Sequence, residues 1–458
     1  MTPDESDFWF LPLGGTGEIG MNLNLYGHNG RWLMVDCGVT FESGTDVDGE
    51  PILGARAHVQ MADPQFITDR KDKLDGLIIT HAHEDHIGAV PYLWERFQCP
   101  IYTTAYTAEI LRRKLQEAGL TEKVPVHVVD ADTELDVGVF HLQWVRLTHS
   151  IPEPFGLVIS TPAGRVFHTA DWKLDAAPVL GERYQAQDYQ ALAELDIDAM
   201  VCDSTNADVP GWSASEASLY KGLKHHVEQA SGRVVVTCFG SNIARLRTIA
   251  DIAQETGRHL GLLGRSLINT YTAAKRTGFW SSVETFVDPH HLGYLPKQTV
   301  LLVATGSQGE PRTALNRLSH NSFRDMQLEP GDTVIFSSKV IPGNEAAIEA
   351  LIERLKAMQI DVITVDNSRM PIHASGHPAV EELKAMYEWV KPRCSIPVHG
   401  EFHHLRANAR VAKSVGISEQ LEGKNGDMYF IAPVRGIRRG AVKTGRLGLI
   451  NNKLKKLF

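Results

Sequence analysis

The sequence predicts an α/β protein with two domains, one of which carries a metal site. Three observations lead to this prediction. The chain has 458 residues, more than one hydrophobic core usually holds. Four side chains that can bind a metal fall between residues 81 and 86, directly after an apolar run. Segments typical of strands and helices alternate between residues 216 and 365, and this order predicts a parallel sheet flanked by helices.

The composition is typical of a soluble globular protein, with 43% hydrophobic and 22% charged residues. The five cysteines are scattered and none forms a C-x-x-C pair, which indicates a reducing compartment and argues against a thiolate zinc site. The first seven residues are acidic and polar, unlike a signal peptide. No apolar run reaches the length that spans a membrane. We therefore expect a cytoplasmic protein.

The net charge of −9 counts mildly against nucleic-acid binding as a bulk property, but it does not exclude a local basic channel. After Asp427 the sequence has no acidic residue. The basic residues that follow are Arg435, Arg438, Arg439, Lys443, Arg446, Lys453, Lys455 and Lys456. Two interpretations of this segment stay open, a solvated basic tail and a contact with a nucleic-acid backbone.

The first elements are a glycine-rich turn and a hairpin. Four glycines between residues 14 and 20 predict a tight turn with close backbone approach. Their spacing fits neither a dinucleotide fingerprint nor a P-loop. Residues 22–26 and 32–36 are predicted to pair as strands. Asp36 ends the second strand, where it could orient a metal ligand or cap a turn.

The densest cluster of candidate ligands follows the apolar run at residues 77–79. His81 and His83 are predicted to project from the strand end. Asp85 and His86 are predicted to lie at the start of the next helix and to serve a second ion. Imidazole together with carboxylate suits zinc, and manganese less well.

Further candidate ligands lie at the ends of other predicted strands. His149 follows the strand at residues 140–147, and Asp171 follows an apolar run that ends at residue 170. Because a carboxylate has two oxygens, Asp171 suits a position shared by two ions. Asp203 and His399 also end apolar strands. A sandwich of strands would bring these side chains to one rim beside residues 81–86.

A polar stretch at residues 207–213 is predicted to join the two domains. In the second domain, Ser241 and Asn242 start a predicted helix, where backbone N–H groups favour anions. From residue 370 the chain is predicted to return to the first domain. The turn that follows offers imidazole, hydroxyl and N–H groups suited to a phosphate. Its residues are His373, Ala374, Ser375, Gly376 and His377.

Taken together, these residues resemble the metallo-β-lactamase superfamily, and the inserted region resembles its β-CASP branch. The ribonuclease J family within that branch is most similar. The segments that carry the resemblance span roughly residues 11–410 and are LGGTGEIGMN, VDCGVTF, THAHEDHIGA, DSTN, FGSNIARL, ATGSQGEP, IPGNE, HASGH and PVHGE.

The resemblance implies an αββα sandwich with an inserted α/β β-CASP domain that contains a parallel sheet. The boundaries expected from it are 1–208 for the first part of the sandwich, 209–369 for the insertion and 370–458 for the return with a basic tail. Long ribonucleases J carry a further C-terminal domain of about a hundred residues. We expect this domain to be absent, because the sequence ends at Phe458.

The resemblance also implies the ligand sets and roles. One zinc would take His81, His83, His149 and Asp171, and the second would take Asp85, His86, Asp171 and His399. Asp85 would position the attacking hydroxide, and His377, oriented by Asp203, would protonate the leaving oxygen or hold the phosphate. The turn at 373–377 and the helix start at Ser241 would bind backbone phosphates.

The activity implied is a zinc- or manganese-dependent ribonuclease of RNA processing and decay. It would act on single-stranded RNA from a 5′-monophosphate end, with endonucleolytic entry where the groove is open, and it would form a homodimer. Alternatives are a DNA-directed nuclease of the same branch, a hydrolase of small thioesters or lactams, and an inactive scaffold. The inserted segment 206–366 argues against the small-molecule hydrolase. The filled ligand positions argue against the scaffold.

Overall fold

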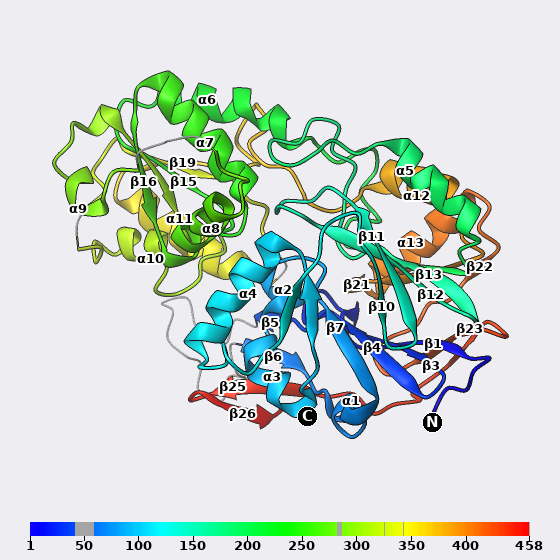
Figure 1. The fold of residues 1–458 in the computed structure, drawn as a ribbon. Coiled ribbons are helices and arrows are strands. Elements are labelled where there is room, and N and C mark those ends of the chain that lie inside the picture. The colour runs from blue at the N-terminus through cyan, green and yellow to red at the C-terminus, as the bar shows by residue number, and fades with distance from the viewer. Residues whose placement is uncertain (42–58, 282–285, 325, 342, 458) are drawn as a thin grey trace.

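Two sheets packed face to face form the core of the larger lobe (Figure 1). The structure is a computed structural model that describes residues 1–41, 59–281, 286–324, 326–341 and 343–457. The first sheet contains, in spatial order, β24 (Gly436–Arg438), β23 (Met428–Ala432), β1 (Phe8–Gly14), β3 (Leu23–His28), β4 (Arg31–Val35), β7 (Leu74–Ile78), β8 (Ile101–Thr103) and β9 (Val126–Val128). The second contains β10 (Glu134–Val137), β11 (Phe140–Arg146), β12 (Phe155–Thr161), β13 (Gly164–His168), β14 (Ala199–Asp203), β20 (Cys394–Val398) and β22 (Glu419–Gln420).

Apolar side chains decide how the layers pack. Phe10 and Tyr26 of the first sheet and Leu157 of the second belong to one buried cluster between the sheets. Helices cover the two outer faces, because their apolar residues recur at helical spacing. Those on the first sheet are α3 (Val90–Phe97) and α4 (Ala105–Glu117), and those on the second are α5 (Ala186–Gln190), α12 (Val380–Val390) and α13 (Phe402–Ser414). This order of layers confirms the predicted sandwich.

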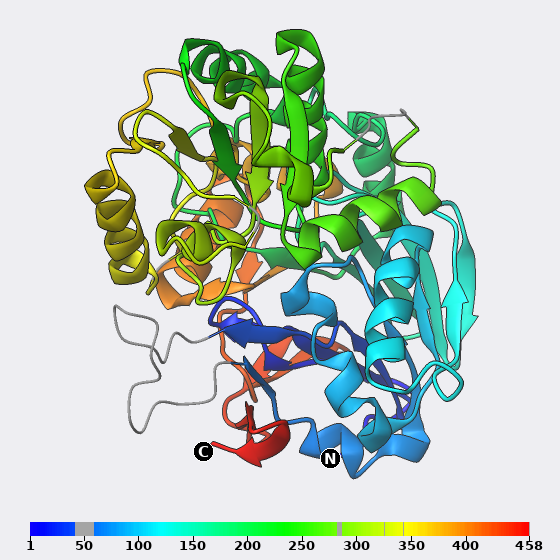
Figure 2. The same cartoon turned by 90° about the vertical axis from the view of Figure 1, so that its left-hand side faces the viewer.

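The smaller lobe, green to yellow in Figures 1 and 2, is built on one parallel sheet. Its strands, in spatial order, are β16 (His259–Leu263), β17 (Val300–Ala304), β15 (Val234–Thr237), β18 (Thr333–Phe336) and β19 (Asp361–Ile363). Two separate apolar clusters pack helices against its two faces. The helices are α6 (Tyr220–Gln229), α7 (Ile243–Thr256) and α8 (Arg265–Arg276) on one face, and α9 (Pro289–Leu292), α10 (Ala314–Ser319) and α11 (Glu345–Ala357) on the other. The predicted parallel sheet is confirmed, and we propose domain boundaries near residues 208 and 369.

The strand order brings distant residues to one edge of the second sheet. β13, β14 and β20 are adjacent and parallel, so their carboxyl ends meet at the same edge. In this register Asp203 pairs with Val398, the residue before His399. Asp171 follows β13 by three residues. The insertion therefore leaves the sheet at β14 and returns to it at β20 with the candidate ligands side by side.

The C-terminal segment, predicted as a basic tail, instead forms strands. β25 (Arg446–Ile450) and β26 (Lys453–Lys456) complete a four-stranded sheet with β5 (Val39–Phe41) and β6 (Val59–Ala62). Several of its basic side chains pair with carboxylates: Arg435 with Glu419, Arg439 with Asp427, Arg446 with Glu18, and Lys456 with Asp63. Apolar residues such as Leu447, which is buried in the first cluster, anchor these strands.

Short elements complete the connections. They are α1 (Gln65–Thr68), α2 (Glu84–Ile87) and the two-stranded sheet of β2 (Thr16–Gly17) and β21 (Gly400–Glu401). In the ranges that the structure describes, every helix is too short or too polar to cross a lipid bilayer.

A buried ion pair holds α7 in the smaller lobe, and we expect its removal to destabilise that lobe. Arg245 is fully buried, and its Nε lies 2.5 Å from Glu216 Oε1. Its Nη1 also donates to Ser337 O at 2.6 Å. Arg245→Leu should lower the free energy of unfolding by about 3–5 kcal/mol, because Glu216 keeps an uncompensated buried charge. Urea unfolding followed by circular dichroism measures this loss.

The double variant Arg245→Leu/Glu216→Leu is the matched control. Replacing both partners by apolar groups of similar volume should recover most of the stability that the single variant loses. Equal losses in the single and double variants would show that the uncompensated charge of Glu216 is not the cause of the loss.

Candidate metal centre

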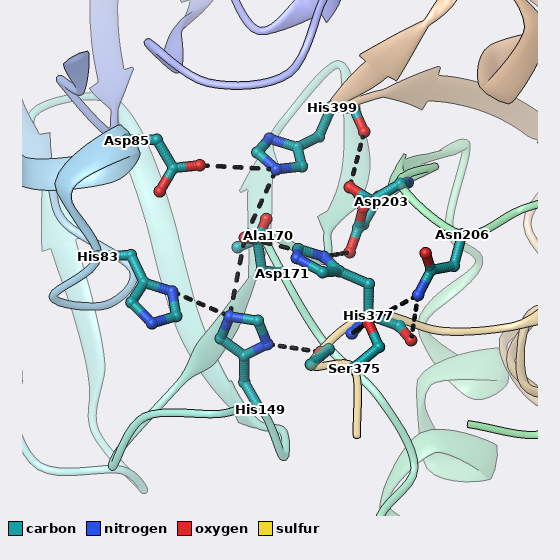
Figure 3. Close-up of polar contacts among 12 residues, drawn as sticks. His83, Asp85, His149, Ala170, Asp171, Asp203, Asn206, Ser375, His377 and His399 are labelled. Atoms are coloured by element: carbon teal, nitrogen blue, oxygen red, sulfur yellow. Dashed lines mark hydrogen bonds and ion pairs between the residues drawn. The ribbon is translucent and has the colours of Figure 1, made fainter. Parts of the chain in front are cut away.

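Two groups of metal-binding side chains meet at Asp171, between the strand ends described above (Figure 3). Within each group, the ligand atoms all lie within 4.8 Å of one another. The first group is His81, His83, His149 and Asp171, and the second is Asp85, His86, Asp171 and His399. The structure thus brings together all seven ligands predicted from the sequence, in the two sets implied by the resemblance.

The shared carboxylate faces both groups through one oxygen. Asp171 Oδ2 lies 3.2 Å from His86 Nε2 and 3.6 Å from His399 Nε2 in the second group. The same atom lies 3.8 Å from the Nε2 atoms of His81 and His149 in the first group. Its other oxygen, Oδ1, is buried without a hydrogen-bond partner among the described residues. One oxygen directed at two ligand groups and one left unsatisfied are what a bridging ligand requires.

Tight backbone turns at the strand ends direct these side chains inward. Asp36, Ala170 and His399 have φ angles of 64°, 51° and 52°, in the left-handed region that residues other than glycine rarely adopt. Each such residue costs roughly 1–2 kcal/mol. Ala170 immediately precedes Asp171, so the turn at Ala170 sets the direction of the shared carboxylate. Such strain persists where the surrounding structure fixes it, as at functional sites.

Hydrogen bonds from outside the ligand groups hold the imidazole rings. Asp36 Oδ2 lies 2.7 Å from His86 Nδ1, and Asp36 also accepts from the Thr80 backbone N–H at 2.9 Å. His149 Nδ1 donates to the Gly376 carbonyl oxygen at 2.5 Å. A ring that donates through Nδ1 presents the lone pair of Nε2 to the site. Asp36 therefore has the orienting contact that the sequence allowed for it, and Thr80 and Gly376 add contacts that the sequence reasoning missed.

The protonation states suit divalent cations. Burial lowers the pKa values of His81 and His149 and lowers that of His83 to about 4, so these rings are neutral near pH 7. Burial alone would raise the pKa of Asp171, but His399 and His86 outweigh it and hold that pKa well below its ordinary value. Neutral imidazoles and ionised carboxylates are the forms that bind metal. Burial lowers the pKa of His86, but Asp171, Asp85 and Asp36 outweigh it and raise that pKa well above its ordinary value, so an ion in the second group would displace a proton from this ring. The donor types of both groups, imidazole and carboxylate, fit a divalent ion.

A histidine–carboxylate pair borders the two groups. His377 Nδ1 lies 2.8 Å from Asp203 Oδ2 and 4.0 Å from Asp171 Oδ2. Asp203 Oδ1 accepts from the backbone N–H and the hydroxyl of Thr205. Burial lowers the pKa of His377, but Asp203, Asp171 and Asp85 outweigh it and raise the pKa to about 9. His377 is therefore a proton donor at neutral pH, and Asp203 fixes its ring.

The predicted phosphate turn, residues 373–377, contacts the same site. Ser375 Oγ accepts from Asn206 Nδ2 at 2.7 Å and from the His377 backbone N–H at 3.2 Å. Ala374 is buried, and His373 Nδ1 is buried without a hydrogen-bond partner within the described ranges. The carbonyl of Gly376 orients His149, as noted above. The turn thus links the ligand His149 to the pair formed by His377 and Asp203.

The two residues predicted to start a phosphate-binding helix have different environments. Asn242 is buried, and its Oδ1 accepts from the Arg245 N–H at 2.9 Å. This contact caps α7, so the Asn242 side chain is already occupied. Ser241 precedes Asn242 in the turn between β15 and α7 and is partly exposed. Of the two side chains, that of Ser241 is the better placed to meet a ligand.

Comparisons with known proteins match each part of the chain. Residues 31–213 match the family described as the beta-lactamase superfamily domain. Residues 231–355 match the family described as the beta-CASP domain of ribonuclease J. Residues 369–422 match the family described as the Zn-dependent metallo-hydrolase RNA specificity domain. The three matches follow the order of sandwich, insertion and return.

Similar proteins extend over nearly the whole sequence. Ribonuclease J of Sinorhizobium meliloti is 40% identical over 437 residues, which cover 94% of this chain and 76% of that protein. Ribonuclease J of Mycolicibacterium smegmatis is 37% identical over 439 residues, which cover 95% of this chain and 76% of that protein. The crystal structure of an Enterococcus faecalis protein of unknown function shares the fold, with a TM-score of 0.62 and 15% identity over 93% of this chain and all of that one.

The likeness to the two bacterial proteins covers both lobes and all the ligands that surround Asp171. The chain therefore belongs to the ribonuclease J family, in the β-CASP branch of the metallo-β-lactamase superfamily.

Proposed function

We propose that this protein is a metal-dependent ribonuclease that hydrolyses phosphodiester bonds of single-stranded RNA. The observation that carries the proposal is the joint placement of two metal-ligand groups on Asp171 beside the His377–Asp203 pair. Relatives named Ribonuclease J and the RNA specificity family matched by residues 369–422 support RNA as the substrate. We further propose that two zinc ions bind per chain, with manganese as the alternative metal.

The bound ions would supply a nucleophile near neutral pH and would stabilise negative charge on the phosphate oxygens. Asp85 Oδ2 lies 3.6 Å from His399 Nε2, and the Asp85 side chain is partly exposed toward solvent. It can therefore accept a hydrogen bond from the attacking water and orient it. The histidines of both groups would hold the ions through their ring nitrogens.

His377 supplies the proton that the leaving oxygen needs. Because its Nδ1 donates to Asp203, the proton available to the substrate is on Nε2. Asp203 keeps this ring charged and oriented before the bond breaks. After the P–O bond breaks, the ribose oxygen takes the proton from Nε2, and solvent restores it.

The direction of cutting follows from where the chain end binds. We propose that the turn at residues 373–377 and the start of α7 at Ser241 hold backbone phosphates, including a 5′ monophosphate. The hydroxyl of Ser375, the ring of His373 and the N–H groups of the turn are the groups that suit it. A pocket for that end favours 5′→3′ exonucleolytic cutting, and an open groove permits endonucleolytic entry. We propose RNA processing and decay in the cytoplasm, by a homodimer, as the setting.

The test uses matched RNA and DNA single strands with a labelled 5′ monophosphate. Wild type and His83→Ala are stripped of metal, reloaded with zinc or manganese, and compared. We expect wild type to release mononucleotides from RNA only when metal is present, and His83→Ala to release none. A preference for DNA would favour the DNA-directed nuclease instead. Equal activity in both proteins, or no need for metal, would refute the proposal.

A further inference from the structure

The glycine-rich opening turn contacts the second ligand group through Asn22. This residue lies between β2 and β3 and is 3% exposed. Its side-chain Nδ2 donates to the Asp85 carbonyl oxygen at 3.1 Å, and its Oδ1 lies 3.0 Å from His399 Nδ1. Its backbone N–H also donates to Asp85 O, at 2.9 Å. The same Nδ2 also lies 3.1 Å from His86 Nε2. One carboxamide thus contacts three predicted ligands of the second group, Asp85, His86 and His399.

The chemistry of the partners fixes how this carboxamide is oriented. A carbonyl oxygen only accepts hydrogen bonds, so the NH₂ group of Asn22 must face Asp85 O. Its oxygen then faces His399, and His399 Nδ1 must carry the proton. The lone pair of His399 Nε2 is left facing Asp85 Oδ2 and Asp171 Oδ2, each 3.6 Å away. Asn22 therefore selects the ring tautomer in which Nε2 can bind a metal.

Two glycines leave the space that this arrangement needs. A Cβ atom at Gly15 would lie 2.1 Å from Asn22 Oδ1, and a Cβ atom at Gly38 would lie 1.7 Å from Asp85 O. Gly15 also has a φ angle of 85°, and its carbonyl accepts from the His399 backbone N–H at 2.6 Å. The close backbone approach predicted for the opening turn is thus made to Asn22 and His399. This explains the glycine at position 15 without a phosphate or nucleotide ligand.

We propose that Asn22 is a positioning residue for the second metal-ligand group. Its Oδ1 accepts a hydrogen bond from His399 Nδ1 and so holds that ring. Its Nδ2 donates to the carbonyl oxygen of Asp85 and so holds the loop that carries Asp85. Loss of Asn22 should weaken metal binding by the second group. The first group, His81, His83 and His149 with Asp171, should keep its affinity for metal. The inference rests on the proposed function in one respect, since both require that the site binds divalent ions.

The test measures the affinities of the first and second zinc equivalents by competition with a chelating dye. We expect Asn22→Ala to weaken the second equivalent by about 10- to 100-fold, the usual effect of removing a group that orients a metal ligand. The first equivalent should stay within about twofold of wild type. Asn22→Asp keeps an acceptor for His399 Nδ1 but turns a second acceptor oxygen toward the Asp85 carbonyl, so it should recover only part of the loss.

Two controls separate positioning from a general loss of structure. Asn24→Ala removes an equally buried amide two residues along, on β3, and should leave both affinities unchanged. In the double variant Asn22→Ala/His399→Ala, the second equivalent should bind less than tenfold more weakly than in His399→Ala alone, because only the contact with the Asp85 carbonyl is then left to lose.

The outcomes decide between the claims. Two results would overturn the inference. One is an unchanged affinity for the second equivalent in Asn22→Ala. The other is an equal weakening of both equivalents in Asn22→Ala and in Asn24→Ala. If Asn22→Ala does not fold, Asn22→Ser decides: a second-site affinity equal to that of wild type in a folded Asn22→Ser protein, whose shorter side chain cannot reach both partners, overturns the inference. A wild type that binds no metal refutes the proposed function. A wild type that binds two ions and cleaves RNA, with Asn22→Ala unaffected, refutes only the inference.

Discussion

Asp171→Ala is expected to abolish RNA hydrolysis and to weaken both metal sites together. The shared oxygen of Asp171 lies within 3.8 Å of nitrogen atoms from both groups, including His81 and His86, so both groups lose a ligand at once. Loss of about 4 kcal/mol of transition-state stabilisation corresponds to a rate lower by about a thousandfold. Initial rates and metal content of the purified variant measure the effect.

A carboxylate elsewhere on the same domain is the comparison for this variant. Asp136 is on β10 and its side chain is 78% exposed, so Asp136→Ala should retain the wild-type rate and metal content. If Asp171→Ala retained both ions at wild-type affinity, the assignment of Asp171 as a shared ligand would be wrong.

His377→Gln should lower kcat by about 10²–10⁴-fold, the range for loss of a positioned general acid. Glutamine can still bond to Asp203 but has no titratable proton for the leaving oxygen. His377 forms a third possible ligand group with Asp171, Asp203 and His399, but it belongs to neither of the two proposed sets, so the affinities for both metal ions should stay near wild type. A variant that lost metal as well as activity would point to a structural role instead. Steady-state rates and the dye competition assay measure the two effects separately.

The pH dependence tests the same assignment through Asp203. The reactive form of His377 is protonated, so activity is lost as pH rises through its pKa. The carboxylates beside it, Asp203 foremost, raise this pKa to about 9 against the effect of burial. Asp203→Asn removes the largest of these charges, so the alkaline limb of the kcat profile should move to lower pH. An alkaline limb at the same pH in wild type and Asp203→Asn would show that His377 is not the group that titrates.

Three of the candidate ligands were predictable because each follows a short apolar strand, and the other four form one dense cluster at residues 81–86. His149, Asp171 and His399 all follow runs of buried residues, and strand ends on one side of a sandwich meet at one rim. The alternation of strands and helices likewise predicted the parallel sheet of the smaller lobe. The division into two ion sets and the roles of His377 and Asp203 came from the family resemblance, because residue types and spacing do not define which ring faces which ion.

Contacts between segments far apart in sequence were not predictable. Asn22 and His399 are 377 residues apart, and an isolated asparagine after a glycine-rich turn has no periodic signal. The pattern of α7 predicts an apolar residue at position 245, on the buried face of the helix. Arg245 can occupy this position because Glu216 compensates its charge. Of the C-terminal strands, β25 pairs with β6 near residue 60, although the basic residues of this segment give it the composition of a solvated tail.

The strand order has a consequence for how the protein is made. β20, which ends at the last ligand, His399, lies inside the second sheet between β14 and β22, and β23 borders β1 in the first sheet. Neither sheet can be completed until the segment from β20 to β24 has left the ribosome. A nascent chain that ends before residue 399 therefore carries six of the seven predicted ligands but not the complete centre.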